Sequence, residues 1–197
     1  SRSLPVVGKG PGIMLDAKNW HIITESQFPW EEEGLLALRK ACDPQHVLEA
    51  WTNFEIFDEQ GKIYEIDALL LTHYSLLVVE LKHWVGQIVI DEATWLRRTD
   101  PRALTTTTNS PLLLTNHKAR VLHGLLRSRA RAEVARVWPL VFITHPDSEV
   151  RFARLGRQQP VATLSNIASL IHAPPMQGRG PKRLDAQSLK ATRQALE

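Results

Sequence analysis

EIDALLLTHYSLLVVELKHWVG, residues 65–86, decides how this chain folds. Its two apolar runs predict neighbouring strands, and THYS between them predicts a turn. Three ionisable residues interrupt this background: Asp67 early in the first run, and Glu80 and Lys82 at the end of the second. Burying an unpaired charge is costly, so these side chains need partners or a purpose.

Strand geometry predicts where these charges lie. Residues two apart share a face of a strand, so Glu80 and Lys82 point the same way. Antiparallel pairing about a turn at residues 72–75 brings Asp67 near Glu80, on a common face within a register error of one residue. Adjacent carboxylates repel unless a cation joins them, and Mg²⁺ typically takes one or two carboxylates together with water and phosphate. Lys82 beside them can orient or deprotonate a water, or stabilise developing charge.

These are the parts needed to cut a phosphodiester bond, but a simpler alternative exists. Glu80 and Lys82 also suit a salt-bridged polar stripe at a strand end, with Asp67 as a surface residue. In the first interpretation, a further acid from the first helix completes the site. Residues 24–42 predict a helix that starts near Pro29, and its Glu31 shares a face with Leu35 and Leu38. Glu31 is therefore the best-placed third carboxylate, and Glu32 is the second choice.

The remaining pattern predicts an α/β protein with a mixed central sheet and helices on both faces. An antiparallel meander of three to five strands is expected between residues 46 and 98, followed by a polar loop. A long helix opens at Pro111, the apolar run at 134–144 predicts a strand buried on both faces, and a short strand and helix follow. The expected domain is 16–173, between a flexible lead-in at 1–15 and a basic Pro/Gly linker at 174–184. Residues 185–197 predict the start of another helix, which suggests that the natural chain continues.

Composition suits one globular domain: 197 residues, 43% hydrophobic and 23% charged. Cys42 is the single cysteine, so an intrachain disulfide is excluded, which fits a reducing, cytoplasmic compartment. No run approaches the ~18 apolar residues of a membrane span, so no membrane partner is expected.

The charge is distributed unevenly. Up to Leu96 there are 7 Lys and Arg against 15 Asp and Glu, and from Arg97 onward 17 against 6. Such a basic half predicts an anionic partner such as DNA, although solvated helix faces would also account for it. The candidate nucleic-acid-binding residues are Lys118, Arg120, Arg127, Arg129 and Arg131.

These motifs resemble the NERD (nuclease-related) domain, a branch of the PD-(D/E)xK nuclease-like fold. The resemblance rests on EID and ELK after an N-terminal helix, then Gly86, Trp95 and NSP before a helix. It implies a restriction-endonuclease-like fold and a DNA endonuclease that uses Mg²⁺ or Mn²⁺. By position it implies Asp67 and Glu80 as metal ligands and catalytic carboxylates, with Lys82 and Glu31 completing the catalytic set.

Several segments are also similar to the N-terminal region of PglW-type serine/threonine kinases of phage-growth-limitation and BREX defence systems, among them KNWHIITESQFPWEEEGL and VFITHPD. This implies an anti-phage setting, other defence proteins as partners, and an attached kinase domain, although these residues contain no kinase motif. One departure is Leu114, where many NERD domains have a glutamine that would face the phosphate. Asn116, His117 or Lys118 are the candidates to replace that polar group. The alternative expectation is thus a catalytically weak or inactive nucleic-acid-binding module that regulates the kinase.

Overall fold

The computed structural model describes residues 13–154, 158–173 and 182–197. The helices are η1 (Ala17–Asn19, a 3-10 turn), α1 (Pro29–Ala41), α2 (Pro111–Arg129), α3 (Ile167–His172) and α4 (Ala186–Leu196). The strands are β1 (Trp20–Ile22), β2 (Val47–Phe57), β3 (Ile63–Thr72), β4 (Leu76–Lys82), β5 (Gly86–Ile90), β6 (Thr94–Arg98), β7 (Thr106–Asn109), β8 (Val137–Ile143), β9 (Ser148–Phe152) and β10 (Val161–Ala162).

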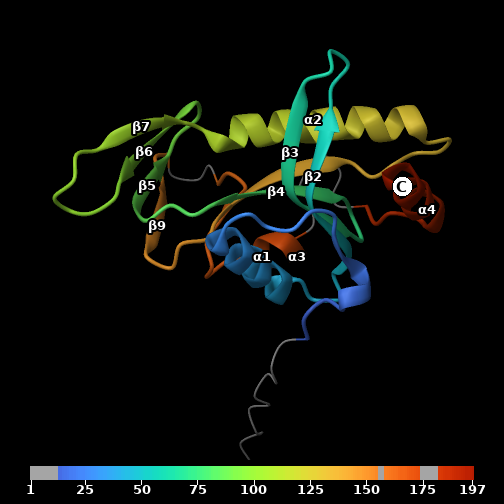
Figure 1. Cartoon of the computed structure of the whole chain (residues 1–197), viewed down its shortest axis with the longest axis horizontal. Coiled ribbons are helices and arrows are strands. Elements are labelled where there is room, and N and C mark those ends of the chain that lie inside the picture. The colour runs from blue at the N-terminus through green and yellow to red at the C-terminus, as the bar shows by residue number, and fades with distance from the viewer. Residues whose placement is uncertain (1–12, 155–157, 174–181) are drawn as a thin grey trace, which may run out of the picture.

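A six-stranded mixed sheet forms the centre of the fold, in the order β1-β2-β3-β4-β8-β10 (Figure 1). Strands β2, β3 and β4 pair antiparallel, whereas β8 pairs parallel to β4, and β1 and β10 pair parallel to β2 and β8. The expected α/β class, with its mixed sheet and antiparallel meander, is confirmed. Strand β4 lies in the interior of the sheet, which explains why its sequence is apolar on both faces.

The turn between β3 and β4 fixes their register. The Thr72 hydroxyl accepts hydrogen bonds from the backbone N–H of Tyr74 and Ser75, each at 3.1 Å. From this turn the ladder runs to the pair Ala68–Val79. The same register continued by one residue sets Asp67 opposite Glu80, as the alternation predicts.

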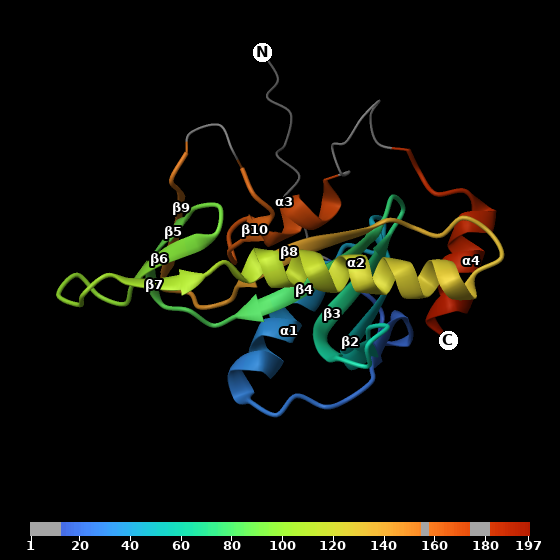
Figure 2. The same ribbon diagram turned by 90° about the horizontal axis from the view of Figure 1, so that it is seen from above.

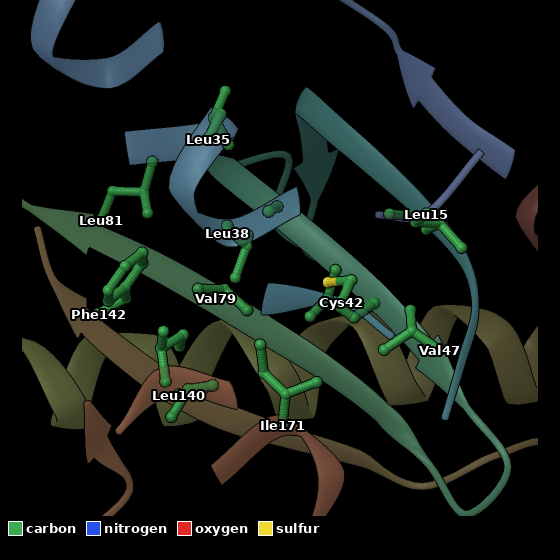
Figure 3. Close-up of a cluster of buried hydrophobic side chains, with 14 of the residues drawn as sticks. Leu15, Leu35, Leu38, Cys42, Val47, Val79, Leu81, Leu140, Phe142 and Ile171 are labelled. Carbon is green, nitrogen blue, oxygen red and sulfur yellow. The ribbon is translucent and has the colours of Figure 1, made fainter. Parts of the chain in front are cut away.

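Helices cover both faces of the sheet. Helix α1 buries Leu35 and Leu38 against Val79, Leu81 and Phe142, and α3 adds Ile171 to this cluster (Figure 3). Helices α2 and α4 cover the other face, where Leu122 and Ala191 meet Leu69 and Val78. Figure 2 shows α2 running along the sheet, with α4 beside its C-terminal end.

A second sheet, in the order β7-β6-β5-β9, lies at the opposite end of the molecule from α4 (Figure 1). The meander therefore stops at β4, because the chain turns sharply at Gly86 and starts a new sheet. Gly86 has φ +85°, and a Cβ there would collide with the carbonyl oxygen of Arg98. Two of these strands differ from the sequence prediction: β7 falls in the expected polar loop, and β9 falls where no separate strand was expected.

The expected domain ends differ in detail from the packed region. Leu15, which the sequence assigns to the lead-in, is buried in the α1 cluster. Helix α4, expected as the start of a further segment, packs on α2, and the Ala135 N–H donates to the Thr192 hydroxyl at 2.9 Å. Residues 1–12 of the lead-in and 174–181 of the linker lie outside the described residues. None of the helices in the described ranges is long and apolar enough to span a membrane.

Candidate active site

Asp67 and Glu80 lie where β3 and β4 separate. Regular pairing ends at Ala68–Val79, and the Asp67 carboxylate (Oδ2) accepts a hydrogen bond from the Leu81 backbone N–H at 2.8 Å. Asn53, in the strand on the other side of β3, has φ 54° and interrupts the pairing with β2 at the same level. The polar side chain of Asp67 thus replaces a regular ladder bond at the end of the β3–β4 ladder, which holds the carboxylate in place.

Two lysines neutralise Glu80. The Lys118 ammonium of α2 lies 2.9 Å from Oε2, and the Lys82 ammonium lies 3.6 Å from Oε1. The Glu80 and Lys118 side chains are only 12% and 8% exposed, whereas Lys82 is 32% exposed. The buried pair thus fixes Glu80, while Lys82 remains accessible to solvent.

Burial and charge make Asp67 a weak acid. Its pKa is raised from 3.8 to about 7, first by desolvation and then by the neighbouring Glu80 carboxylate, with a smaller contribution from Glu31. The Leu81 N–H and the Lys118 charge oppose this rise. A carboxyl whose pKa is displaced this far by burial and a like charge is typical of functional sites.

Glu31 reaches the site from the opposite face of the sheet. It is half-buried in the first turn of α1 and lines a cavity of about 500 Å³ together with Asp67. Glu32, the second choice, is exposed and does not line this cavity. The N-terminal turn of α1 thus faces the same cavity as Asp67 of β3.

Asp67 and Glu80 are the two carboxylates that could share a divalent ion at this position. Asp67 and Glu80 repel each other, as the raised pKa of Asp67 records, and a bound cation would relieve that repulsion. No group of three His, Cys, Asp or Glu residues within the described ranges is arranged to hold a metal. A two-carboxylate set completed by water and phosphate is the mode that Mg²⁺ commonly uses.

The five candidate DNA-binding residues do not form one surface. At 100° per residue, Arg120 and Arg127 lie on the exposed side of α2, nearly opposite the buried Lys118. Arg129 and Arg131 line a separate cleft of about 380 Å³ with Lys190 of α4. Lys118 belongs with Asp67, Glu80 and Lys82, which we call the charged cluster. Two of the four arginines lie on the exposed side of α2, and the other two line the cleft beside α4.

The site also contains a residue that the sequence pattern did not single out. Phe28, the N-cap of α1, lines the same cavity as Glu31 and Asp67. Its position directly before Pro29 is the signal in the sequence, because Pro29 predicts the first residue of the helix. At Leu114, where a glutamine was expected, the side chain is half-exposed, and it is Lys118, one turn later, that reaches Glu80.

Comparisons with known proteins show which sequences this chain resembles. The sequence model of the family described as "Nuclease-related domain" matches residues 26–144. The chain is 32% identical over 161 residues to a protein of Streptomyces coelicolor described as "Probable kinase PglW", which covers 81% of this chain. The chain spans only 10% of that curated relative. No solved structure matches the chain significantly.

Proposed function

This chain belongs to the nuclease-related domain family, and from that membership we propose that it hydrolyses DNA phosphodiester bonds with a divalent metal ion. The observation that carries the proposal is the meeting of Asp67 and Glu80 at the end of the β3–β4 ladder, with Lys82 on the same strand. Two carboxylates can hold a metal ion, and an accessible amine can stabilise the charge that develops during phosphodiester hydrolysis.

Each residue has a distinct part in the proposed reaction. Asp67 and Glu80 would hold Mg²⁺ or Mn²⁺. When bound, the ion would supply positive charge beside the phosphate and would lower the pKa of water. Lys82, the more exposed of the two lysines, orients the attacking water and stabilises the negative charge that develops on the phosphate. Glu31, which lines the same cavity as Asp67, would accept a proton from that water.

Nicking of supercoiled plasmid tests this proposal. The purified chain with Mg²⁺ or Mn²⁺ should nick the plasmid, and a chelator should stop the reaction. Lys82→Ala should abolish nicking, whereas Lys62→Ala, an exposed lysine in the β2–β3 turn, should not. Equal nicking by the wild type and Lys82→Ala would remove the proposed role of Lys82, and the absence of nicking with either metal would remove the activity.

A second function, DNA binding without cleavage, is supported by the lysines around Glu80. Each oxygen of this carboxylate already faces an ammonium group, so the site is balanced in charge without a metal. Such a module would bind DNA through phosphate contacts, and log affinity would fall linearly with log salt concentration. Binding that survives Asp67→Ala, in a chain that never nicks DNA, would favour this function over hydrolysis.

The biological setting is proposed from the relative's description as a probable kinase. In this proposal the domain is the N-terminal part of a longer cytoplasmic serine/threonine kinase in an anti-phage system of the phage-growth-limitation or BREX type. Other defence proteins would be its partners. Lys82→Ala in the longer protein should lower phage resistance if cleavage serves defence, and unchanged resistance would assign defence to the kinase or to DNA binding.

A further inference from the structure

A row of four aromatic rings lies beside the charged cluster. Phe28 and Trp30 are nearly parallel, with centroids 6.1 Å apart and an interplanar angle of 12°. Trp30 stacks on His83 at 5.8 Å and 21°, and His83 contacts His145 at 4.7 Å. A hydrogen-bonding contact of 3.1 Å between His83 Nδ1 and the Thr144 hydroxyl holds the middle of the row. The rings therefore form a continuous row from Phe28 to His145, and its third ring, His83, follows Lys82 in the chain.

Phe28 is the accessible end of this row. It is 53% exposed although it is a large apolar side chain, and its ring borders the cavity that contains Asp67 and Glu31. Two other rings near the site are less available. The Arg97 guanidinium lies 4.0 Å from the ring centroid of Trp84, and Trp95 is completely buried. A flat ligand that enters from solvent would therefore meet Phe28 first.

The cavity beside Phe28 suits a base better than a phosphate. Its described lining includes five carboxylates and no lysine or arginine; the acids are Glu25, Glu31, Glu55, Glu65 and Asp67. Apolar groups such as Ile23 and Phe54 complete the wall. Its volume of about 500 Å³ lies within the ~300–1,000 Å³ usual for small-molecule pockets. Glu25, Glu55 and Glu65 would repel a phosphate, whereas Lys82 would attract it. The backbone of a bound strand would therefore pass at the Asp67 side of the cavity while a base enters beside Phe28.

We propose that Phe28 stacks on an unpaired nucleobase at the mouth of this cavity, so that the domain engages single-stranded or locally unpaired DNA. Bases inside an intact duplex cannot stack on a protein ring, because both of their faces are already covered. The inference rests on the proposed function in assigning DNA as the ligand, and it adds the form of DNA that the site accepts.

Fluorescence anisotropy with labelled oligonucleotides tests the proposal in the presence of a chelator, so that cleavage does not interfere. Three probes of equal length are compared: a single strand, its duplex, and a single strand with abasic positions. The variants are Phe28→Leu, which keeps an apolar side chain without a ring, and Phe28→Trp, which keeps a ring. Phe57→Leu is the matched control, because Phe57 is 52% exposed in the β2–β3 hairpin and does not line the cavity.

Phe28→Leu should weaken binding of the single strand by roughly 5- to 100-fold, the range for loss of one stacked base. Its affinity for the abasic strand should not change, and Phe28→Trp and Phe57→Leu should bind like the wild type. Equal affinity of the wild type for base-bearing and abasic strands would overturn the proposal, as would a Phe28→Leu variant that binds the single strand normally.

The two proposals fail in different ways. Nicking that depends on Lys82 but not on Phe28 would leave hydrolysis standing and remove base stacking. Stacking that depends on Phe28, in a chain that never nicks DNA, would remove hydrolysis and leave this inference standing.

Discussion

Removing the Lys118 ammonium measures how strongly Glu80 depends on it. Lys118→Met keeps an unbranched side chain of similar length and deletes the charge 2.9 Å from Glu80. Breaking a buried ion pair by removing one partner costs about 3–5 kcal/mol, because the remaining charge is left uncompensated. Lys82 lies 3.6 Å from the other oxygen and remains as a partner, so we expect the lower end, about 3 kcal/mol.

Urea unfolding followed by tryptophan fluorescence, at neutral pH with a chelator, measures this loss. With a slope of about 1–3 kcal/mol per molar urea, the midpoint should fall by about 1 M or more. A double-mutant cycle with Glu80→Gln isolates the pair. Once Glu80 is neutral, Lys118→Met should cost much less, with a coupling energy of up to about 3 kcal/mol.

Lys40→Met is the matched control, since Lys40 is an exposed lysine on α1. Its effect should stay within about 0.5 kcal/mol, as for most surface substitutions. If Lys118→Met were as mild as Lys40→Met, or if its cost did not depend on Glu80, the buried pair would not be what holds the carboxylate.

Three further outcomes follow from the same geometry. Since the pKa of Asp67 is raised from 3.8 to about 7, its contribution to stability is full below pH 4 and is lost as the pH rises through 7. The free energy of unfolding of Asp67→Asn, measured by chemical denaturation, should therefore rise relative to that of the wild type by roughly 2–3 kcal/mol between pH 5 and pH 8. If the difference in unfolding free energy between the two proteins did not change with pH, the raised pKa would be contradicted. Mn²⁺ should raise the melting temperature of Lys118→Met more than that of the wild type, because the vacated Glu80 oxygen becomes available; equal shifts would contradict that competition. Gly86→Ala should lower the free energy of unfolding by more than about 3 kcal/mol in the same assay, because its Cβ would collide with the Arg98 carbonyl. Gly124→Ala is the control, since Gly124 has open space around it, and it should not lose stability. A small loss of stability in Gly86→Ala would contradict the clash.

The meeting of Asp67 and Glu80 was predictable from the sequence because it depends on local rules. The alternation along two adjacent strands and a short Thr72–Ser75 turn leave little freedom in their register. The parallel pairing of β5 with β9 was not predictable in the same way. It joins segments about 60 residues apart, and no local pattern specifies such a partner.

The sequence predicts the role of Lys118 only in part. It offers Lys118 as a DNA-binding residue and as a substitute for the glutamine that Leu114 replaces, but not as the partner of Glu80, because a lysine on a basic helix is usually solvated. Its neighbours Thr115, Ala119 and Leu122 are buried, so the inward stripe of the helix runs through position 118. A charged residue on such a stripe predicts a buried counter-ion, and Glu80 is that counter-ion.

Helix α4 shows that the packed domain extends beyond the residues that match the family. The residues that match the family end at 144, yet Ala191 and Ala195 of α4 seal the cluster formed by Val134, Ala135 and the sheet. A fragment trimmed to 26–144 would carry every candidate catalytic residue but would expose that cluster, and β8 would lose its pairing with β10. A protein that is engineered to carry this site therefore needs α4 and β10 as well as residues 26–144.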